Sequence, residues 1–155
     1  MVATGQGQAL VTNLNCPFCL IAERADENVR EVFRDDKAVA FFPIEPAALG
    51  HILVIPRRHV SFVWDLSKEE AEHIGLLISR MSHVIVETVN SEGLNIIQSN
   101  GKAATQSIAH VHFHLVPRWS DDGLGRIWPP KTNYSEQAKD ETWYALRDAC
   151  TGIHL

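Results

Sequence analysis

The stretch His110-Val111-His112-Phe113-His114-Leu115-Val116 decides the fold prediction for this chain. Three histidines alternate with apolar residues, and successive side chains of a β-strand point to opposite faces. The pattern therefore predicts a strand with three imidazoles on one face and apolar side chains on the other. Like charges on one face disfavour protonation, which makes a structural accident a poor explanation. The row predicts a reactive site, either a metal site or a row of catalytic groups.

Length and composition fit a single soluble domain. The chain has 155 residues, of which 45% are hydrophobic and 21% charged. A net charge of −5 argues against indiscriminate nucleic-acid binding but leaves room for a small phosphorylated ligand. We expect no membrane span, because no apolar run is long enough. Residues 1–13 lack the features of a secretory signal, so we expect a flexible leader and a cytoplasmic protein.

The cysteines point to metal more than to a disulfide framework. Cys16 and Cys19 form a Cys-x-x-Cys pair, and Cys150 lies far away near the end of the sequence. Such a pair is either half of a metal site or a redox pair. A redox pair should follow a strand, whereas a polar leader precedes this one, so metal is favoured and two further ligands are required. Cys150 is expected to be a free, structural thiol.

Hydrophobic spacing and turn residues predict an α+β fold. The clearest element is a helix over residues 68–89, because Ser67 and Glu70 form a capping box and apolar residues then recur at helical spacing. The other predicted elements are a short helix at 19–24, strands at 31–34, 38–42, 50–56, 94–99 and 110–116, and a last helix at 136–149. Strands, one long helix and then a hairpin favour an antiparallel sheet.

Several motifs together resemble the histidine triad superfamily. Residues 110–116 look like its signature, and Cys16-Pro17-Phe18-Cys19 resembles the cysteine pair of many bacterial members. The segment Gly50–His59 is similar to the family block Gly-His-x-Leu-Val-Ile-Pro-Lys-x-His. Further matching positions are Leu94-Asn95-Ile96, Asn100-Gly101, Gln106-Ser107 and Pro117-Arg118. The resemblance runs in one register from about Cys16 to Gly123 and favours the nucleotide-binding branch over the fragile histidine triad hydrolases.

The resemblance implies an architecture and an assembly. It implies a histidine triad domain over residues 14–118, with a five-stranded antiparallel sheet, one long helix and a short N-terminal helix. It also implies a homodimer in which the two sheets join into one. Residues 119–155 are then expected to form a C-terminal extension that packs on the domain or on the dimer interface.

The resemblance also implies a reaction. A nucleoside phosphoramidate, or a related nucleotidyl compound of AMP type, would be cleaved through a covalent intermediate on His112. An imidazole attacks phosphorus only when neutral, and two neighbouring histidines help to keep it so. His114 with Ser107 would meet the leaving group as a proton donor, while Gln106 and Ser107 would place the phosphoryl oxygens. The implied purine nucleotide site consists of His51, Ile44, Asn95, Ser99, Gln106, Ser107, His112 and His114.

A structural zinc ion is implied in members that carry the cysteine pair. Cys16, Cys19, His59 and His110 would supply two thiolates and two imidazoles, which is a closed tetrahedral set. This zinc would brace the geometry around His112 without touching the substrate.

Three positions depart from the family pattern. Pro43 stands where a ribose-contacting aspartate is common, and Ser99 and Thr105 replace a common Asn and Gly. A β-branched Thr105 limits any conformation with φ above zero, so we expect altered loop geometry for phosphate binding.

Other functions stay open at this point. The chain could be a non-catalytic nucleotide-binding module with a structural zinc, or a dinucleoside polyphosphate hydrolase. It could also hold a catalytic zinc on His110, His112 and His114, although three ligands on one straight strand span too far to converge easily.

Overall fold

The computed structural model describes residues 15–127 and 133–153, and the chain divides between Leu124 and Gly125 into two units, each described by itself. The expected leader at residues 1–13 lies outside the described residues. The helices are α1 (Pro17–Glu23), α2 (Lys68–Val89) and α3 (Glu136–Ala149), with short 3-10 turns at Val63–Asp65, Lys102–Ala104 and Cys150–Gly152. The strands are β1 (Glu31–Arg34), β2 (Ala38–Phe41), β3 (Ile52–Pro56), β4 (Gly93–Gln98) and β5 (Phe113–Arg118).

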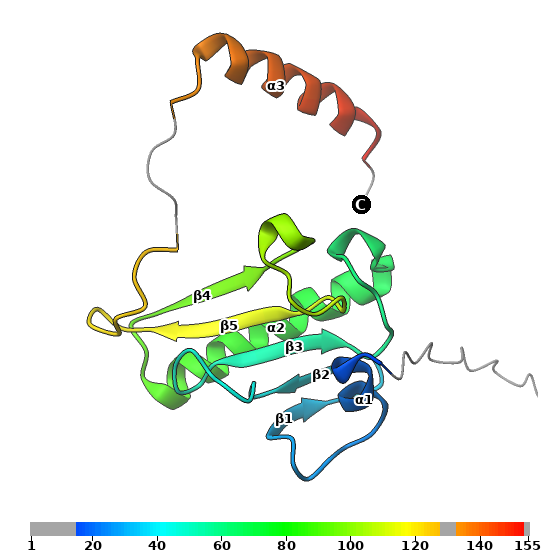
Figure 1. The fold of residues 1–155 in the computed structure, drawn as a ribbon, viewed down its shortest axis with the longest axis vertical. Coiled ribbons are helices and arrows are strands. Elements are labelled where there is room, and N and C mark those ends of the chain that lie inside the picture. Colours follow the sequence, from blue (N-terminus) through cyan, green and yellow to red (C-terminus); the bar gives the residue numbers. More distant parts are fainter. Residues whose placement is uncertain (1–14, 128–132, 154–155) are drawn as a thin grey trace, which may run out of the picture. The chain divides into compact units, whose positions relative to one another are not determined.

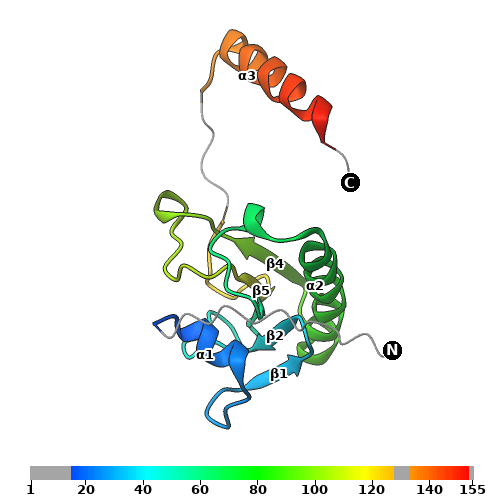
Figure 2. The same cartoon turned by 90° about the vertical axis from the view of Figure 1, so that its right-hand side faces the viewer.

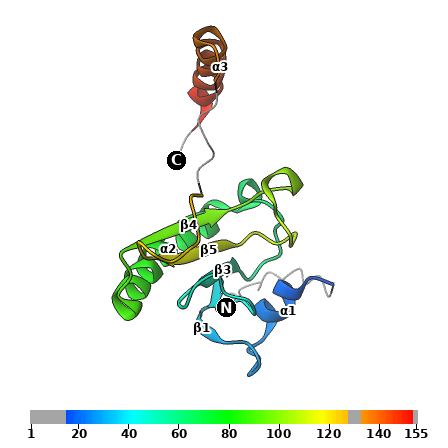
Figure 3. The ribbon, with the colours of Figure 1, turned by 60° about the vertical axis from the view of Figure 1, so that its left-hand side comes forward.

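The five strands form one antiparallel sheet in the order β1-β2-β3-β5-β4, as Figure 1 shows. β5 lies between β3 and β4, and His114 pairs with Leu53 on one side and Ile97 on the other. Figure 3 shows β4 and β5 side by side. The predicted α+β class and the antiparallel five-stranded sheet are confirmed.

The two faces of the sheet are covered by different helices (Figure 2). α2 covers one face with Ile74, Leu77, Met81 and Ile85, which pack on a core that includes Leu115. α1 covers part of the other face, where its residues pack on the core that contains Leu53. Directly paired residues of an antiparallel ladder point to the same face. His114, the partner of Leu53, therefore lies on the face that α1 covers.

α2 follows the sequence prediction closely. The Ser67 hydroxyl accepts a hydrogen bond from the Glu70 N–H at 3.2 Å, and the Glu70 carboxylate accepts one from the Ser67 N–H at 2.9 Å. This is the predicted capping box. The helix ends at Val89, and the following residue, Asn90, adopts a left-handed conformation with φ of 50°.

The predicted histidine strand is only partly correct. β5 begins at Phe113, so His114 lies in the strand whereas His110 and His112 precede it. The ladder with β4 ends at the pair Gln98 and Phe113, where the loop after β4 departs. The Val111 N–H instead donates to the Val60 carbonyl at 2.7 Å. The three imidazoles still lie on the side that α1 covers, because the Phe18 ring packs against the rings of His110 and His112, and the His112 ring packs against that of His114.

The C-terminal unit contains α3 within its predicted bounds. The Ser135 hydroxyl caps its first turn by accepting from the Ala138 N–H. Cys150 is a free cysteine, as expected, but it is exposed and therefore has no structural role in a core. Packing of residues 119–155 on the domain or on a dimer interface stays a prediction. In the two described ranges, no helix combines the length and the apolar character of a membrane span.

Candidate functional site

His112 is held in a single tautomer by a backbone carbonyl two residues earlier in the chain. Its Nδ1 lies 2.8 Å from the His110 carbonyl oxygen, which can only accept a hydrogen bond. The proton of a neutral His112 ring is therefore on Nδ1, and Nε2 carries a lone pair. The ring is buried, and the Phe18 ring packs edge-on against it at a centroid distance of 5.2 Å. His112 is thus an oriented imidazole with a nucleophilic nitrogen.

His51 and His114 form a hydrogen-bonded pair beside it. The Ala47 N–H donates to Nδ1 of His51 at 3.0 Å, so the proton of a neutral His51 is on Nε2. That Nε2–H donates to Nδ1 of His114 at 2.9 Å, which leaves the His114 proton on Nε2. The rings of His114 and His112 are 5.0 Å apart.

Burial disfavours the charged forms of His51 and His114. Burial, and to a smaller extent the neighbouring His112 and His51, lower the pKa of His114 to about 4. Burial also lowers the pKa of His51. A neutral His114 can donate a hydrogen bond through its Nε2–H, but it carries no positive charge. The sequence placed both residues in the site, but it gave no sign that Ala47 sets their tautomers.

The side chain of Gln106 ties the loop between β4 and β5 to the segment after β3. Its Oε1 accepts from the Gly101 N–H at 2.7 Å, and its Nε2 donates to the Ser61 carbonyl at 2.8 Å. Asn100 adds a second tie, because its Oδ1 accepts from the Val63 N–H at 2.8 Å. Gln106 is therefore a structural part of the loop, and its predicted contact with phosphoryl oxygens stays a prediction.

Thr105 does not behave as the sequence predicted. It adopts φ of 64° and ψ of 23°, the left-handed conformation that glycine would take without cost. A β-branched residue pays about 1–2 kcal/mol for this backbone. The turn compensates through hydrogen bonds, including one from the Thr105 N–H to the Lys102 carbonyl at 3.0 Å. The expected limit on positive φ is wrong, and the loop stores strain at the candidate site.

Replacing Thr105 with glycine should relieve this strain. We expect Thr105→Gly to raise the free energy of unfolding by about 1 kcal/mol, since the relief exceeds the extra entropy of the unfolded chain. Urea denaturation of both proteins measures the difference. Thr105→Ala is the matched control, because it keeps a Cβ and should recover only part of the gain. A glycine variant less stable than the alanine variant would contradict a strained Thr105.

The other predicted nucleotide contacts are placed as follows. The Asn95 Oδ1 accepts from Nη1 of Arg118 at 2.6 Å, on the face of the sheet that His114 shares. Ile44 is 94% exposed, and Ser107 is exposed in the loop. Ser99 follows the end of β4. The structure brings His51, His112 and His114 together. The nucleotide contacts of Ile44, Asn95, Ser99 and Ser107 stay predictions.

Cys16, Cys19, His59 and His110 converge on one point. Their four donor atoms lie within 4.8 Å of one another. Nδ1 of His110 is 3.6 Å from both sulfur atoms, and Nδ1 of His59 is 3.1 Å from Sγ of Cys19. Donors around a tetrahedral zinc are separated by about 3.3–3.8 Å, so the residues fit this metal.

The ring of His110 is oriented for this cluster. Its Nε2–H donates to the Pro56 carbonyl at 3.0 Å, so a neutral ring presents the Nδ1 lone pair to the cysteines. Four converging donors favour a metal site over a redox pair. They also argue against a zinc shared by the three alternating histidines, because His110 faces the cysteines and Nδ1 of His112 faces a carbonyl.

The fold and the site define a small α+β protein that presents one oriented histidine beside a neutral histidine pair. Residues 24–121 match the family model described as the HIT domain, and the chain belongs to this family.

Named relatives and solved structures agree with this assignment. An adenosine 5'-monophosphoramidase from Schizosaccharomyces pombe is 32% identical over 127 residues, which cover 81% of this chain and 92% of that protein. A bis(5'-adenosyl)-triphosphatase from Dictyostelium discoideum is 38% identical over 86 residues, 56% of this chain and 58% of that protein.

Two crystal structures show the likeness in three dimensions. A HIT family protein from Bacillus subtilis has a TM-score of 0.78 and 29% identity, covering 91% of this chain and 99% of that chain. A zinc-bound histidine triad protein from Mycobacterium smegmatis has a TM-score of 0.66 and 29% identity, covering 87% of this chain and 97% of that chain.

Proposed function

We propose that this protein is a nucleotidyl hydrolase or transferase that cleaves nucleoside phosphoramidates of AMP type, with His112 as the nucleophile. One observation carries the proposal. The hydrogen bond from Nδ1 of His112 to the His110 carbonyl leaves Nε2 unprotonated and able to attack phosphorus. A relative named as a phosphoramidase supports the choice of substrate.

The reaction has two displacements. Nε2 of His112 attacks the phosphorus, and the P–N bond of the substrate breaks as the new N–P bond forms. The departing nitrogen accepts a hydrogen bond from the His114 Nε2–H and takes a proton from a water molecule. The remaining hydroxide attacks the phosphorus, the bond to His112 breaks, and the nucleoside monophosphate leaves.

This scheme changes the role expected of His114. A group with a pKa of about 4 is uncharged at neutral pH, so His114 does not act as a general acid there. It can still hold the leaving group by a hydrogen bond, because His51 fixes its proton on Nε2. Ser107 and the loop N–H groups would contact the phosphoryl oxygens.

The cluster of Cys16, Cys19, His59 and His110 would hold a structural zinc ion. Such an ion would cross-link the start of α1, through Cys16 and Cys19, to His59 after β3 and His110 before β5, with no part in the chemistry. The proximity of the four donors and the zinc-bound relative support this assignment.

A homodimer with a continuous sheet is part of the proposal. β4 is at one end of the strand order, and Ile96 on this strand is 53% exposed. A bare strand edge with an apolar side chain is suited to pairing with another strand.

A dinucleoside polyphosphate hydrolase is the second candidate, since one relative carries the name of a triphosphatase. The same attack by His112 would then break a P–O bond. The leaving group is a nucleotide instead of an amine, so comparing the two substrates in one assay separates these activities. A pocket that binds AMP but turns over neither substrate would identify a binding module.

Trapping the intermediate tests the proposal. The protein is mixed with an adenosine phosphoramidate, quenched in mild base after a few milliseconds to seconds, and measured by intact mass. We expect an adduct of one adenylyl group that peptide mapping assigns to His112. Turnover without any such adduct at any time point would argue against the covalent route.

A further inference from the structure

α1 needs support from outside itself. It has seven residues, and isolated helices shorter than about 12 residues are marginal in water. Its last turn consists of apolar residues and Glu23, so its terminal carbonyl groups need donors from elsewhere. Cys19 lies within α1 and Cys16 immediately precedes it. The contacts that anchor α1 therefore also determine the positions of Cys16 and Cys19, two of the four candidate metal donors.

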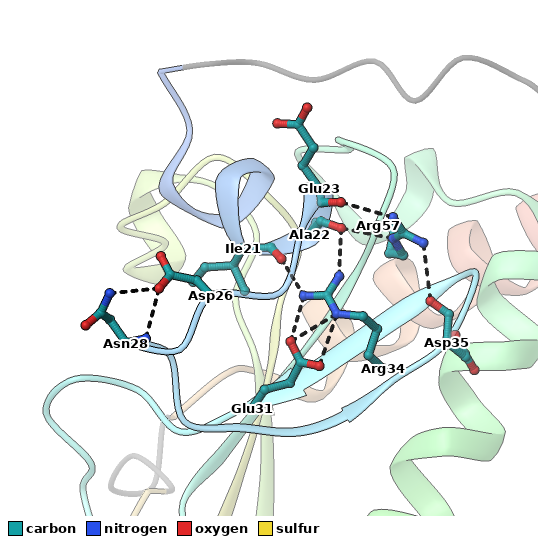
Figure 4. A network of polar contacts seen from close by, with 9 residues as sticks. All are labelled: Ile21, Ala22, Glu23, Asp26, Asn28, Glu31, Arg34, Asp35 and Arg57. Atoms are coloured by element: carbon teal, nitrogen blue, oxygen red, sulfur yellow. Dashed lines mark hydrogen bonds and ion pairs between the residues drawn. The ribbon is translucent and has the colours of Figure 1, made fainter.

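Two arginines bind the open carbonyl groups of α1 (Figure 4). Arg34, the last residue of β1, donates through Nη2 to Ile21 at 2.7 Å and through Nη1 to Ala22 at 3.0 Å. Arg57, which follows β3, donates through Nε to Ala22 at 2.9 Å and through Nη2 to Glu23 at 3.3 Å. We call Arg34 and Arg57 the arginine clamp.

The clamp is itself held in place. Nε of Arg34 lies 3.1 and 3.0 Å from the two carboxylate oxygens of Glu31, and its Nη2 is 2.7 Å from one of them. The Arg34 side chain is only 19% exposed. Positive charge at the C-terminal end of a helix interacts favourably with the helix dipole, and charged donors strengthen the hydrogen bonds. The clamp therefore fixes the end of α1 from the last residue of β1 and from the residue that follows β3.

One short segment links the clamp to the candidate metal site. Pro56 accepts the hydrogen bond from Nε2 of His110, the next residue is Arg57, and His59 follows two positions later. Sγ of Cys19 lies 3.1 Å from Nδ1 of that histidine. Within four consecutive residues, Pro56 therefore orients the His110 ring, Arg57 anchors α1, and His59 supplies the second imidazole.

We propose that Arg34 and Arg57 are positioning residues for the metal site. They hold α1 against the sheet before any metal binds, so that the two cysteines already face His59 and His110. Binding then requires little ordering of the chain, which favours high affinity. Neither arginine contacts the metal. This inference rests on the proposed zinc site, but not on the proposed reaction.

Zinc affinity is the first test. Competition with a chromogenic chelator compares the wild type with Arg34→Gln, Arg57→Gln and the double variant. We expect the dissociation constant to rise about tenfold for each single change, at the low end of effects of residues that support metal ligands. Arg30→Gln, an exposed residue just before β1, is the matched control and should bind zinc as the wild type does. Arg57→Lys keeps the charge but not the fork of donors and should recover only part of the loss.

Hydrogen exchange of the zinc-free proteins separates positioning from general weakening. We expect the amides of residues 20–23 to be protected in the wild type and to exchange rapidly in the double variant, while the α2 amides stay protected. Zinc should restore protection of α1 in the double variant. Unchanged zinc affinity, equal loss of protection in α2, or a wild type that binds no zinc would each overturn the proposal. Neither measurement uses turnover, so failure of the proposed reaction would be seen separately.

Discussion

Replacing His112 with alanine is expected to abolish turnover of adenosine phosphoramidates, lowering kcat/KM by about 10⁴-fold or more. The substitution removes the nitrogen that forms the bond to phosphorus, and residual catalysis by the rest of the site cannot supply a covalent route. The geometry makes His112 the sensitive position, because its Nδ1–H is fixed on the His110 carbonyl at 2.8 Å and its Nε2 is the unprotonated nitrogen. Steady-state kinetics with one phosphoramidate measures the loss.

Two further substitutions sharpen this result. His112→Gly leaves space for a small molecule, so added imidazole should restore part of the turnover, whereas it should not help the wild type. His83→Asn is the matched control, since His83 is an exposed residue of α2 that contacts Glu87. Turnover that survives in both His112→Ala and His112→Gly without imidazole would contradict the assignment of His112 as the nucleophile.

The sequence predicts those parts of the fold that local patterns determine. The capping box at Ser67 and the apolar spacing that follows it locate α2, and the observed helix begins at Lys68 and ends at Val89. The bounds of α3 also follow from its local pattern. In both cases the deciding hydrogen bonds join residues within one turn of each other, so they are visible in the sequence.

The start of β5 could not be predicted in this way. Alternation of histidines is compatible with a strand from His110 onward, but a strand also needs partners. The ladder with β4 stops at Phe113, and the next backbone group, at Val111, pairs with Val60. Those partners are set by the loop after β4 and the segment after β3, which no periodicity describes.

The same limit applies to the site. The resemblance to the histidine triad proteins gave the four candidate metal donors, which the structure brings within 4.8 Å of one another. It did not give the tautomers, because these depend on the Ala47 N–H and on two backbone carbonyls. Thr105 shows the opposite case. Its local preference is overridden by the turn in which it lies, at a cost that the hydrogen bonds of that turn offset.

Removal of the proposed zinc ion should destabilise the protein without abolishing the proposed reaction. Metal that binds only the folded state adds about 4 kcal/mol at a free concentration 1,000 times its dissociation constant. We therefore expect chelation to lower the free energy of unfolding by about this amount. Chemical denaturation with and without a chelator, paired with metal analysis of the purified protein, measures the effect.

The variants of this experiment locate the metal. Cys19→Ser should lower stability and make it insensitive to the chelator, while Cys150→Ser, at an exposed position of the C-terminal unit, should respond as the wild type does. Turnover should persist in the chelated protein at temperatures where it is folded, since the hydrogen bond that orients His112 comes from a backbone carbonyl and not from a metal. Complete loss of turnover with the fold intact would mean that the metal takes part in the chemistry. Protein purified without any zinc, and indifferent to chelators, would mean that the four donors stabilise α1 by packing and hydrogen bonds alone.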